Sequence, residues 1–189
     1  MNLNLTGKKV LVTGSSRGIG LQIANAFIVE GCSVVFNSRS SFKSQGPSNS
    51  DACFVSGDVS SEIGAKKVVD EAASILDGLD IVICNVGSGK SVPPGQETQE
   101  AWIDSFDVNF YSTIHTIQAA RSFLKASQGV IVCISSICGT EVILGAPVTY
   151  SVSKAALNAY VKGISRPFGE EGIRICAVAP GNIIFDGSV

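Results

Sequence analysis

A tyrosine and a lysine four positions apart, Tyr150 and Lys154, form the pair of side chains in this sequence best suited to moving a proton. Residues at i and i+4 share one face of a helix. A phenol with its ordinary pKa near ~10 exchanges protons poorly at neutral pH, and a fixed positive charge beside it lowers that pKa. The pair therefore predicts an acid/base catalyst acting on a carbonyl–alcohol pair. A solvated lysine beside a packed tyrosine is the alternative that this spacing leaves open.

Two further polar residues, Ser136 and Asn109, stand at unusual places in the chain. Ser136 follows an apolar run at residues 129–135, where its hydroxyl could bond a substrate oxygen. Its neighbour Ser135 competes for that role, but side chains alternate along a strand, so the two should point in opposite directions. Asn109 lies inside a predicted helix, where asparagine is not favoured. It could hold a water or kink the helix. An ordinary strand-ending serine and a plain helix junction remain the alternatives.

A glycine-rich turn lies near the start of the chain, with glycines at 14, 18 and 20. It joins an apolar run at residues 9–13 to a predicted helix at 18–30. The first turn of a helix presents unpaired N–H groups and the positive end of a dipole, and glycines let the backbone approach a pyrophosphate closely. The spacing is Gly-x3-Gly-x-Gly, which differs from the Gly-x-Gly-x-x-Gly fingerprint. A tight strand-to-helix turn without a ligand is the alternative.

The second apolar run, at residues 33–37, ends in Asn37-Ser38-Arg39 and carries no carboxylate. A site for NAD usually has an acidic residue there to accept the ribose 2′-hydroxyl. Guanidinium groups bind phosphate well, so Arg17 and Arg39 are candidates to bind a 2′-phosphate. The pattern therefore favours NADP(H), with NAD(H) as the second candidate. The alternative for Arg39 is a solvated loop residue.

The elements that must position these residues alternate between strands and helices along the chain. Strands are predicted at 9–13, 33–37, 52–56, 80–84, 129–135 and 173–179, and helices at 18–30, 58–76, 97–108, 109–127 and 149–170. Pro167 should tighten or end the last helix, and residues 40–50 read as a loop. This order predicts an α/β fold with a doubly wound, Rossmann-like parallel sheet of about six strands and helices on both faces. Residues 1–189 are expected to form one dinucleotide-binding and catalytic domain.

In such sheets, ligands bind beyond the carboxyl ends of the strands. The unusual residues of this chain fall in that place after each predicted strand in turn. They are the turn from Gly14 to Gly20, then Arg39, Asp58, Asn85-Val-Gly87, Ser135-Ser136 and Pro180-Gly181. This shared placement predicts a single site along one edge of the sheet.

Composition and charge exclude several other classes of protein. The net charge is −2 with both signs scattered, so no basic patch indicates nucleic acid or an anionic membrane. No apolar run reaches the length of a membrane span, and the first residues lack the order of a signal peptide. The six cysteines include no Cys-x-x-Cys pair, which favours buried reduced thiols over disulfides or metal. We expect a cytoplasmic protein without a metal site.

Taken together, these motifs resemble the short-chain dehydrogenase/reductase family, in the family's order and at close to its spacings from residue 7 onward. Within the family, the chain is most similar to the group that includes 3-oxoacyl-carrier-protein reductases. The matching motifs are Thr13-Gly-Ser-Ser-Arg-Gly-Ile-Gly20, Asp58-Val59, Asn85-Val-Gly87, Asn109, Ser136, Tyr150-x3-Lys154 and Pro180-Gly181.

The resemblance implies four catalytic residues. Tyr150 would be the general acid that protonates the carbonyl oxygen, and Lys154 would lower the pKa of Tyr150 and bond the nicotinamide ribose. Ser136 would orient the carbonyl, and Asn109 would hold a water in a proton relay. The residues implied to bind the cofactor are Gly14, Ser16, Arg17, Gly18, Ile19, Arg39, Asp58, Val59, Asn85, Gly87, Tyr150, Lys154, Pro180, Gly181 and Ile183.

The sequence departs from the family pattern at several points. Valine replaces the usual alanine at Val86, and one residue more than is commonest separates Ser136 from Tyr150. The loop at 40–50 stands where the family often has a helix. Family members normally continue well past Pro180-Gly181, so we expect the substrate loop and the last strand of the family to be missing here. The resemblance also implies a homodimer or homotetramer, formed through helices at 102–126 and 149–170.

Two functions follow from these observations. The first is an NADP(H)-dependent oxidoreductase that interconverts a small-molecule carbonyl and an alcohol by hydride transfer. The second is a truncated dinucleotide-binding protein without turnover, which would act as a sensor or a partner subunit. Intact Ser136, Tyr150 and Lys154 favour the first function.

Overall fold

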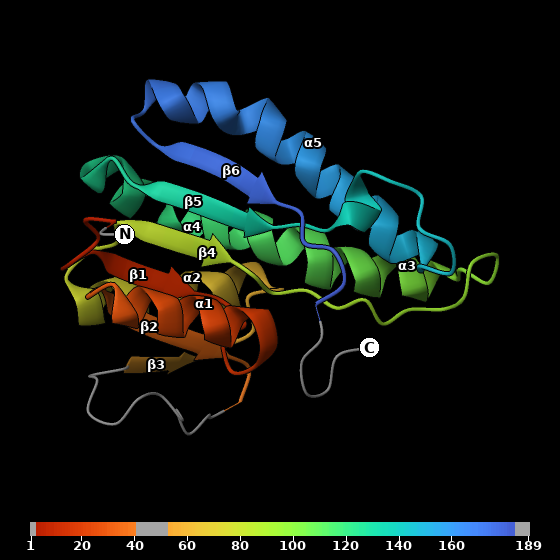
Figure 1. The fold of residues 1–189 in the computed structure, drawn as a ribbon, viewed down its shortest axis with the longest axis horizontal. Helices are drawn as coiled ribbons and strands as arrows, with labels where there is room; N and C mark the ends of the chain where they lie inside the picture. Colours follow the sequence, from red (N-terminus) through yellow and green to blue (C-terminus); the bar gives the residue numbers. More distant parts are fainter. Residues whose placement is uncertain (1–2, 41–52, 184–189) are drawn as a thin grey trace.

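The computed structural model of the protein describes residues 3–40 and 53–183. Six strands form one sheet in the order β3-β2-β1-β4-β5-β6, and every neighbouring pair is parallel. This order confirms the predicted doubly wound, Rossmann-like sheet (Figure 1). The strands are β1 (Lys9–Val12), β2 (Ser33–Ser38), β3 (Cys53–Ser56), β4 (Ile81–Cys84), β5 (Val130–Ile134) and β6 (Arg174–Val178).

Helices cover both faces of this sheet, as the alternating pattern predicts. On one face, buried side chains of α2, α4 and α5 pack with Leu11 and Val82 in one core cluster. On the other face, α1 packs with Val10 and Val12 in a second cluster. The helices are α1 (Gly18–Val29), α2 (Glu62–Leu76), α3 (Gln99–Phe106), α4 (Ser112–Ser127) and α5 (Val148–Glu170), with a π-helical turn η1 (Asp107–Tyr111) and a short 3-10 turn η2 (Ile137–Gly139).

The central strands are buried on both faces, which explains their continuous apolar runs. All four residues of β4 are buried, and so are the last three of β1. Full burial of a Val, Leu or Ile side chain stabilises the fold by about 1.5–3 kcal/mol each. The strands that carry the site are therefore anchored in the best-packed part of the sheet.

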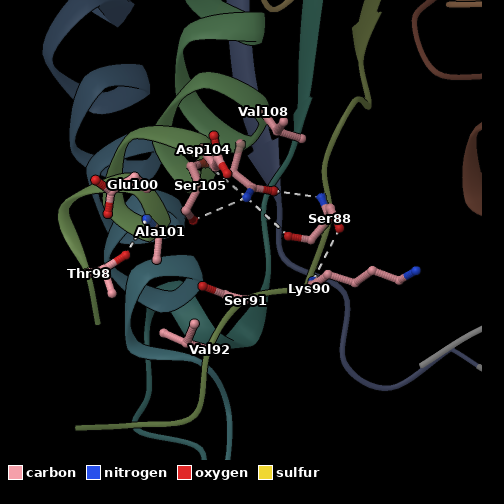
Figure 2. A pocket seen from close by; sticks show the side chains of 11 residues that line it. Ser88, Lys90, Ser91, Val92, Thr98, Glu100, Ala101, Asp104, Ser105 and Val108 are labelled. Carbon is pink, nitrogen blue, oxygen red and sulfur yellow. Dashed lines mark hydrogen bonds between the residues drawn. The ribbon is translucent and has the colours of Figure 1, made fainter. Parts of the chain in front are cut away.

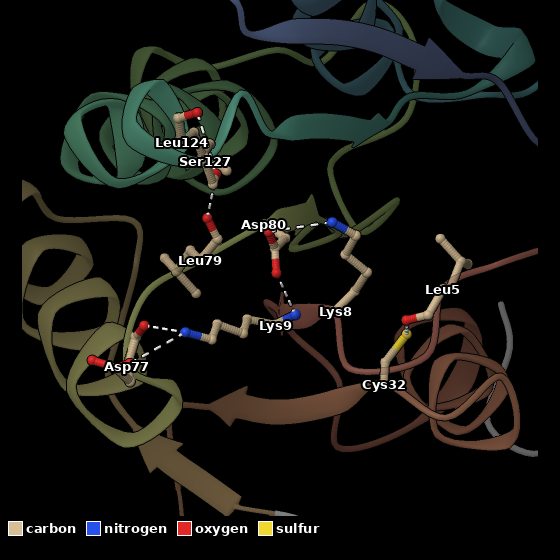
Figure 3. A network of polar contacts seen from close by, with 9 residues as sticks. All are labelled: Leu5, Lys8, Lys9, Cys32, Asp77, Leu79, Asp80, Leu124 and Ser127. Atoms are coloured by element: carbon tan, nitrogen blue, oxygen red, sulfur yellow. Dashed lines mark hydrogen bonds and ion pairs between the residues drawn. The ribbon is translucent and has the colours of Figure 1, made fainter.

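The amino ends of β1 and β4 are joined by Asp80, at the edge opposite the predicted site (Figure 3). Its carboxylate accepts a hydrogen bond from the Lys9 backbone N–H at 2.9 Å and lies 3.7 Å from Lys8 Nζ. Beside it, the Ser127 hydroxyl donates to the Leu79 carbonyl at 2.7 Å, which ties the end of α4 to the start of β4. These contacts hold the sheet together away from the carboxyl ends of the strands.

One helix boundary differs from the sequence-based prediction, and two others agree with it. The helix predicted from residue 58 begins instead at Glu62, because Ser61 is its N-cap and accepts from Gly64 N at 3.1 Å. The two successive helices predicted at 97–127 are found as α3 and α4, joined by the π-helical turn η1. Helix α5 runs to Glu170, as predicted for the helix at 149–170, and the exposed Pro167 lies in its last turns without ending it.

Asp58 lies in a turn ahead of α2 and is not the first residue of that helix. Its carboxylate accepts hydrogen bonds from the backbone N–H of Ser60 at 3.0 Å and from the Ser60 hydroxyl at 2.8 Å. Such bonds from an aspartate to the backbone compete with helix formation. The helix therefore starts only after this turn is complete.

The loop predicted at 40–50 lies, apart from Ser40, outside the described residues. Of the six cysteines, all free, only Cys84 and Cys133 are fully buried, so the prediction of buried thiols holds for those two. No helix in the described part of the chain is long and apolar enough to cross a membrane. Within residues 3–40 and 53–183, no group of three or more His, Cys, Asp or Glu side chains gathers as a metal site would require.

Candidate cofactor and active site

The turn after β1 needs glycine at two positions for different reasons. Gly14 has a φ of +62°, a conformation that side chains rarely adopt. A Cβ at Gly20 would lie 2.3 Å from Asn85 Nδ2 and 2.5 Å from the Gly14 carbonyl oxygen. The start of α1 therefore packs directly on the turn and on the residue that follows β4.

The first turn of α1 is open to an anion. Its N-cap, Arg17, makes no side-chain capping bond, and the first turn carries no acidic residue. No side chain of that turn therefore places a negative charge beside the free N–H groups and the positive end of the helix dipole. Gly18 and Ile19 begin this helix, and Ser16 lies just before it. These residues fit the pyrophosphate of a dinucleotide.

Asn85 holds the turn after β1 against the end of β4. Its Nδ2 donates to the carbonyls of Thr13 at 3.1 Å and Gly14 at 3.0 Å. Its backbone N–H donates to the Thr13 hydroxyl at 3.0 Å. The structure thus gives Asn85 a positioning task, in addition to the ribose contact that the family resemblance implies.

Asn37 is a site-supporting residue that sequence reasoning missed. It is buried in β2, and its Nδ2 donates to the carbonyls of Val55 and Gly57, both at 3.1 Å. Its Oδ1 accepts from Gly14 N at 3.4 Å. A polar residue at the end of an otherwise apolar strand is the signal that could have found it.

The residues predicted for the adenosine end are mostly exposed. The side chains of Arg17, Arg39 and Asp58 all reach the surface. Val59 is only 2% exposed and packs in the core, so only its backbone can face a ligand. The three charged groups therefore remain available to a bound dinucleotide.

The four predicted catalytic residues come from three segments, and two of them meet directly. Ser136 lies close enough to the Tyr150 phenol to act on its ionisation. Ser136 also caps η2, since its hydroxyl accepts from Cys138 N at 3.2 Å. A Cβ at Gly139 would lie 2.7 Å from the Lys154 carbonyl carbon, so η2 packs on the backbone of α5. This contact brings Ser136 to Tyr150.

Ser135 and Ser136 differ as their alternation predicts. Ser136, and not Ser135, is the serine that lies beside the Tyr150 phenol. The Ser135 hydroxyl is buried and has no hydrogen-bond partner within the described residues, while its backbone N–H donates to the Val178 carbonyl at 2.8 Å. Of the two serines, Ser136 is therefore the one that lies beside Tyr150.

Lys154 is only 3% exposed, and its Nζ donates to the Ile134 carbonyl at 2.8 Å. Burial lowers the pKa of Lys154 from 10.5 to about 8. Burial also raises the pKa of Tyr150, and the nearby Ser136 hydroxyl opposes that rise. The expected lowering of the Tyr150 pKa is therefore not found, because burial outweighs the favourable contacts of the phenol.

Asn109 lies in the π-helical turn η1 and is 1% exposed. Its Oδ1 accepts from Ser88 N at 2.8 Å, and its Nδ2 donates to the carbonyls of Ser88 at 3.1 Å and Ser105 at 3.0 Å. The wide turn thus directs Asn109 onto the loop after β4. Single-turn π-helical segments inside helices occur frequently at functional sites.

Gly87 connects this loop to Lys154. A Cβ on Gly87 would lie 3.1 Å from Asn109 Oδ1 and 3.2 Å from Lys154 Nζ. Asn109, Gly87 and Lys154 therefore form one packed group. A cavity of about 370 Å³ lies beside it, between residues 88–92 and α3 (Figure 2).

The segment after β6 packs against η2. The Pro180 carbonyl accepts from Ile137 N at 3.1 Å, and a Cβ at Gly181 would lie 3.8 Å from Ile137 Cδ1. Ile183 is 49% exposed. Pro180 and Gly181 thus lie next to the turn that carries Ser136, as their predicted place at a strand end requires.

Comparison with known proteins assigns the chain to a family. A family model described as short chain dehydrogenase matches residues 8–186, and the chain belongs to this family of oxidoreductases. L-fucose dehydrogenase of Mus musculus is 34% identical over 184 residues, which are 94% of this chain and 66% of the mouse protein. The chain thus spans slightly less than two thirds of that relative.

Two solved structures share the fold. The NADH-dependent reductase A1-R′ complexed with NAD superposes with a TM-score of 0.88 at 25% identity, covering 96% of this chain and 81% of that one. The Pseudomonas aeruginosa RhlG/NADP active-site complex has a TM-score of 0.88 at 24% identity, covering 97% and 75%. The second likeness concerns the fold alone.

Proposed function

We propose that this protein is an NADP(H)-dependent oxidoreductase that interconverts a small-molecule carbonyl and an alcohol, with Tyr150 as the general acid and base. The observation that carries the proposal is the placement of Ser136 beside the Tyr150 phenol, one helical turn from the buried Lys154. A hydroxyl pair of this kind can hold a carbonyl oxygen and deliver a proton to it. Membership of the 3-oxoacyl-carrier-protein reductase group stays a prediction.

The chain's own residues fit a nicotinamide dinucleotide. The open first turn of α1 would bind the pyrophosphate, and the close approach at Gly14 and Gly20 leaves backbone rather than side chain at its surface. Of the two solved structures with this fold named above, one is a complex with NAD and the other a complex with NADP. When bound, the dinucleotide supplies or accepts the hydride.

The protein residues would then act on the oxygen of the substrate. Ser136 would orient the carbonyl, and Tyr150 would donate its phenolic proton to the oxygen as the alcohol forms. Lys154 would place a positive charge near the phenol, and Asn109 would keep the loop at 87–88 in place beside Lys154. In the reverse direction Tyr150 would accept the proton from the alcohol.

Sustained turnover separates this function from the alternative of a protein that holds the dinucleotide without reacting. The test is steady-state oxidation of NADPH with a panel of ketones and aldehydes. Continued oxidation that depends on the carbonyl supports the oxidoreductase. Tight NADPH binding with no turnover on any carbonyl of the panel would favour the alternative. A cytoplasmic location and a homodimer or homotetramer remain predictions.

The preference for NADP(H) rests on two exposed arginines, Arg17 and Arg39, and on the lack of a carboxylate at the end of β2. We expect Arg39→Ala to weaken NADPH binding about 10- to 100-fold, because hydrogen bonds to charged groups contribute about 1.5–3 kcal/mol. NADH binding should not change. Fluorescence titration with both dinucleotides measures this, with Arg166→Ala, an exposed arginine on α5, as the control. Equal loss for both dinucleotides would refute the preference.

Gly87 offers a second test, this one of the packed group around Lys154. In Gly87→Ala the new methyl group would press on Asn109 Oδ1 and Lys154 Nζ. We expect kcat to fall on the order of tenfold, since a small displacement of a catalytic group is costly. Gly89→Ala is the matched control, because a Cβ there meets nothing within 4 Å. Equal kcat in the two variants would contradict the placement of Lys154.

A further inference from the structure

The loop after β4 is tied to the site at two separate points. At Ser88 it is held by the Asn109 side chain, with contacts of 2.8 and 3.1 Å. At Ser91 its hydroxyl lies 2.6 Å from the Thr149 hydroxyl in the first turn of α5. Figure 2 shows Ser91 and Val92 on the side of the loop near α3, with Lys90 extending away from it. The loop therefore bridges η1 and the start of α5.

Thr149 immediately precedes Tyr150 and is fully buried. Helical Ser and Thr side chains commonly bond a carbonyl three or four residues earlier in their own helix. Ser151 does so with the Pro147 carbonyl at 3.0 Å, and Ser153 does so with the Tyr150 carbonyl at 2.8 Å. The Thr149 hydroxyl instead contacts a residue 58 positions away in the sequence.

We propose that Thr149 and Ser91 are a positioning pair, which fixes the first turn of α5 and with it the direction of the Tyr150 phenol toward Ser136. The inference rests on the proposed function of Tyr150. The pair works with the Asn109–Ser88 contact, because both hold the same loop. Asn109 and Tyr150 are thereby placed relative to one another by a single short segment, residues 87–91.

The test compares three substitutions and one control. Thr149→Val keeps the shape of the side chain and removes the hydroxyl, Thr149→Ser keeps a hydroxyl, and Ser91→Ala removes the partner at an exposed position. Ser151→Ala removes a hydroxyl that bonds only within its own helix. We expect Thr149→Val and Ser91→Ala each to lower kcat about 10- to 100-fold, with no further loss when combined. Thr149→Ser and Ser151→Ala should stay near wild type.

A second measurement reports on the phenol without requiring turnover. Ultraviolet difference titration of wild type against Tyr150→Phe isolates the ionisation of Tyr150. We expect Thr149→Val and Ser91→Ala to shift this titration, and Ser151→Ala to leave it unchanged. An unshifted titration in both variants overturns the positioning pair, whatever the activity. Wild-type protein without turnover, together with a shifted titration, would instead overturn the proposed function and leave the pair supported.

Discussion

Tyr150→Phe is expected to lower kcat for carbonyl reduction by about 100- to 10,000-fold, the range that general acid catalysis contributes. The substitution removes the proton donor and keeps the ring, so the packing of α5 should persist. Ser136 retains its bond to Cys138 N and is not left without a partner. NADPH binding should be unchanged, because the hydroxyl acts on the substrate oxygen. Steady-state NADPH oxidation and fluorescence titration measure the two quantities.

Tyr160→Phe is the matched control for this variant. Tyr160 lies on the same helix, is partly buried, and packs edge-on against Phe110 with ring centroids 6.0 Å apart. Loss of its hydroxyl should leave kcat near wild type. If Tyr150→Phe retained most of its activity, or if both variants lost activity equally, Tyr150 would not be the proton donor.

Lys154→Met is expected to lower kcat about 100-fold or more, the loss typical of removing one charge-stabilising donor from an active site. Methionine fills similar space without the charge and leaves the Ile134 carbonyl without its donor. Comparison with Lys162→Met, an exposed lysine on the same helix, separates this effect from a general change in α5. Undiminished kcat in Lys154→Met would refute the assigned role.

The same variant tests the burial of Lys154 through the pH dependence of stability. The folded-state pKa is about 8 and the ordinary value is 10.5, so between these values the unfolded chain binds the proton and the folded chain does not. The contribution of Lys154 to the unfolding free energy therefore rises with pH in this window, by up to about 3 kcal/mol, and is constant below it. Lys154→Met should lack this rise. Urea unfolding across the window measures it, and equal pH dependence in both proteins would contradict the burial.

The strands could be predicted closely because burial on both faces leaves a direct trace in the sequence. The continuous apolar run Ile81-Val-Ile-Cys84 is buried at every position, and the strand is found there. The nearness of Ser136 and Tyr150 could be anticipated through the family resemblance, because the order of the predicted elements alone does not bring the two together. Their contact depends on η2, which packs on α5 through Gly139.

Other parts of the site depend on tertiary contacts that leave no local pattern. Nothing around Thr149 indicates that its hydroxyl meets Ser91, because the two are 58 residues apart. Asn37 looks like a strand-ending residue until the fold places Val55 and Gly57 beside it. The pKa of Tyr150 moved opposite to the prediction for the same reason, since burial of the phenol is a property of the packed site.

Transfer of deuterium tests the central claim most directly. The wild-type protein is incubated with a reactive carbonyl and NADPH that carries deuterium at C4 of the nicotinamide, and the alcohol is examined by mass spectrometry. We predict that the transferable deuterium appears at the carbinol carbon, one atom for each alcohol formed. Two results would contradict hydride transfer at this site. One is an alcohol that carries no deuterium whichever face of C4 of the NADPH is labelled, and the other is no alcohol from any carbonyl tested.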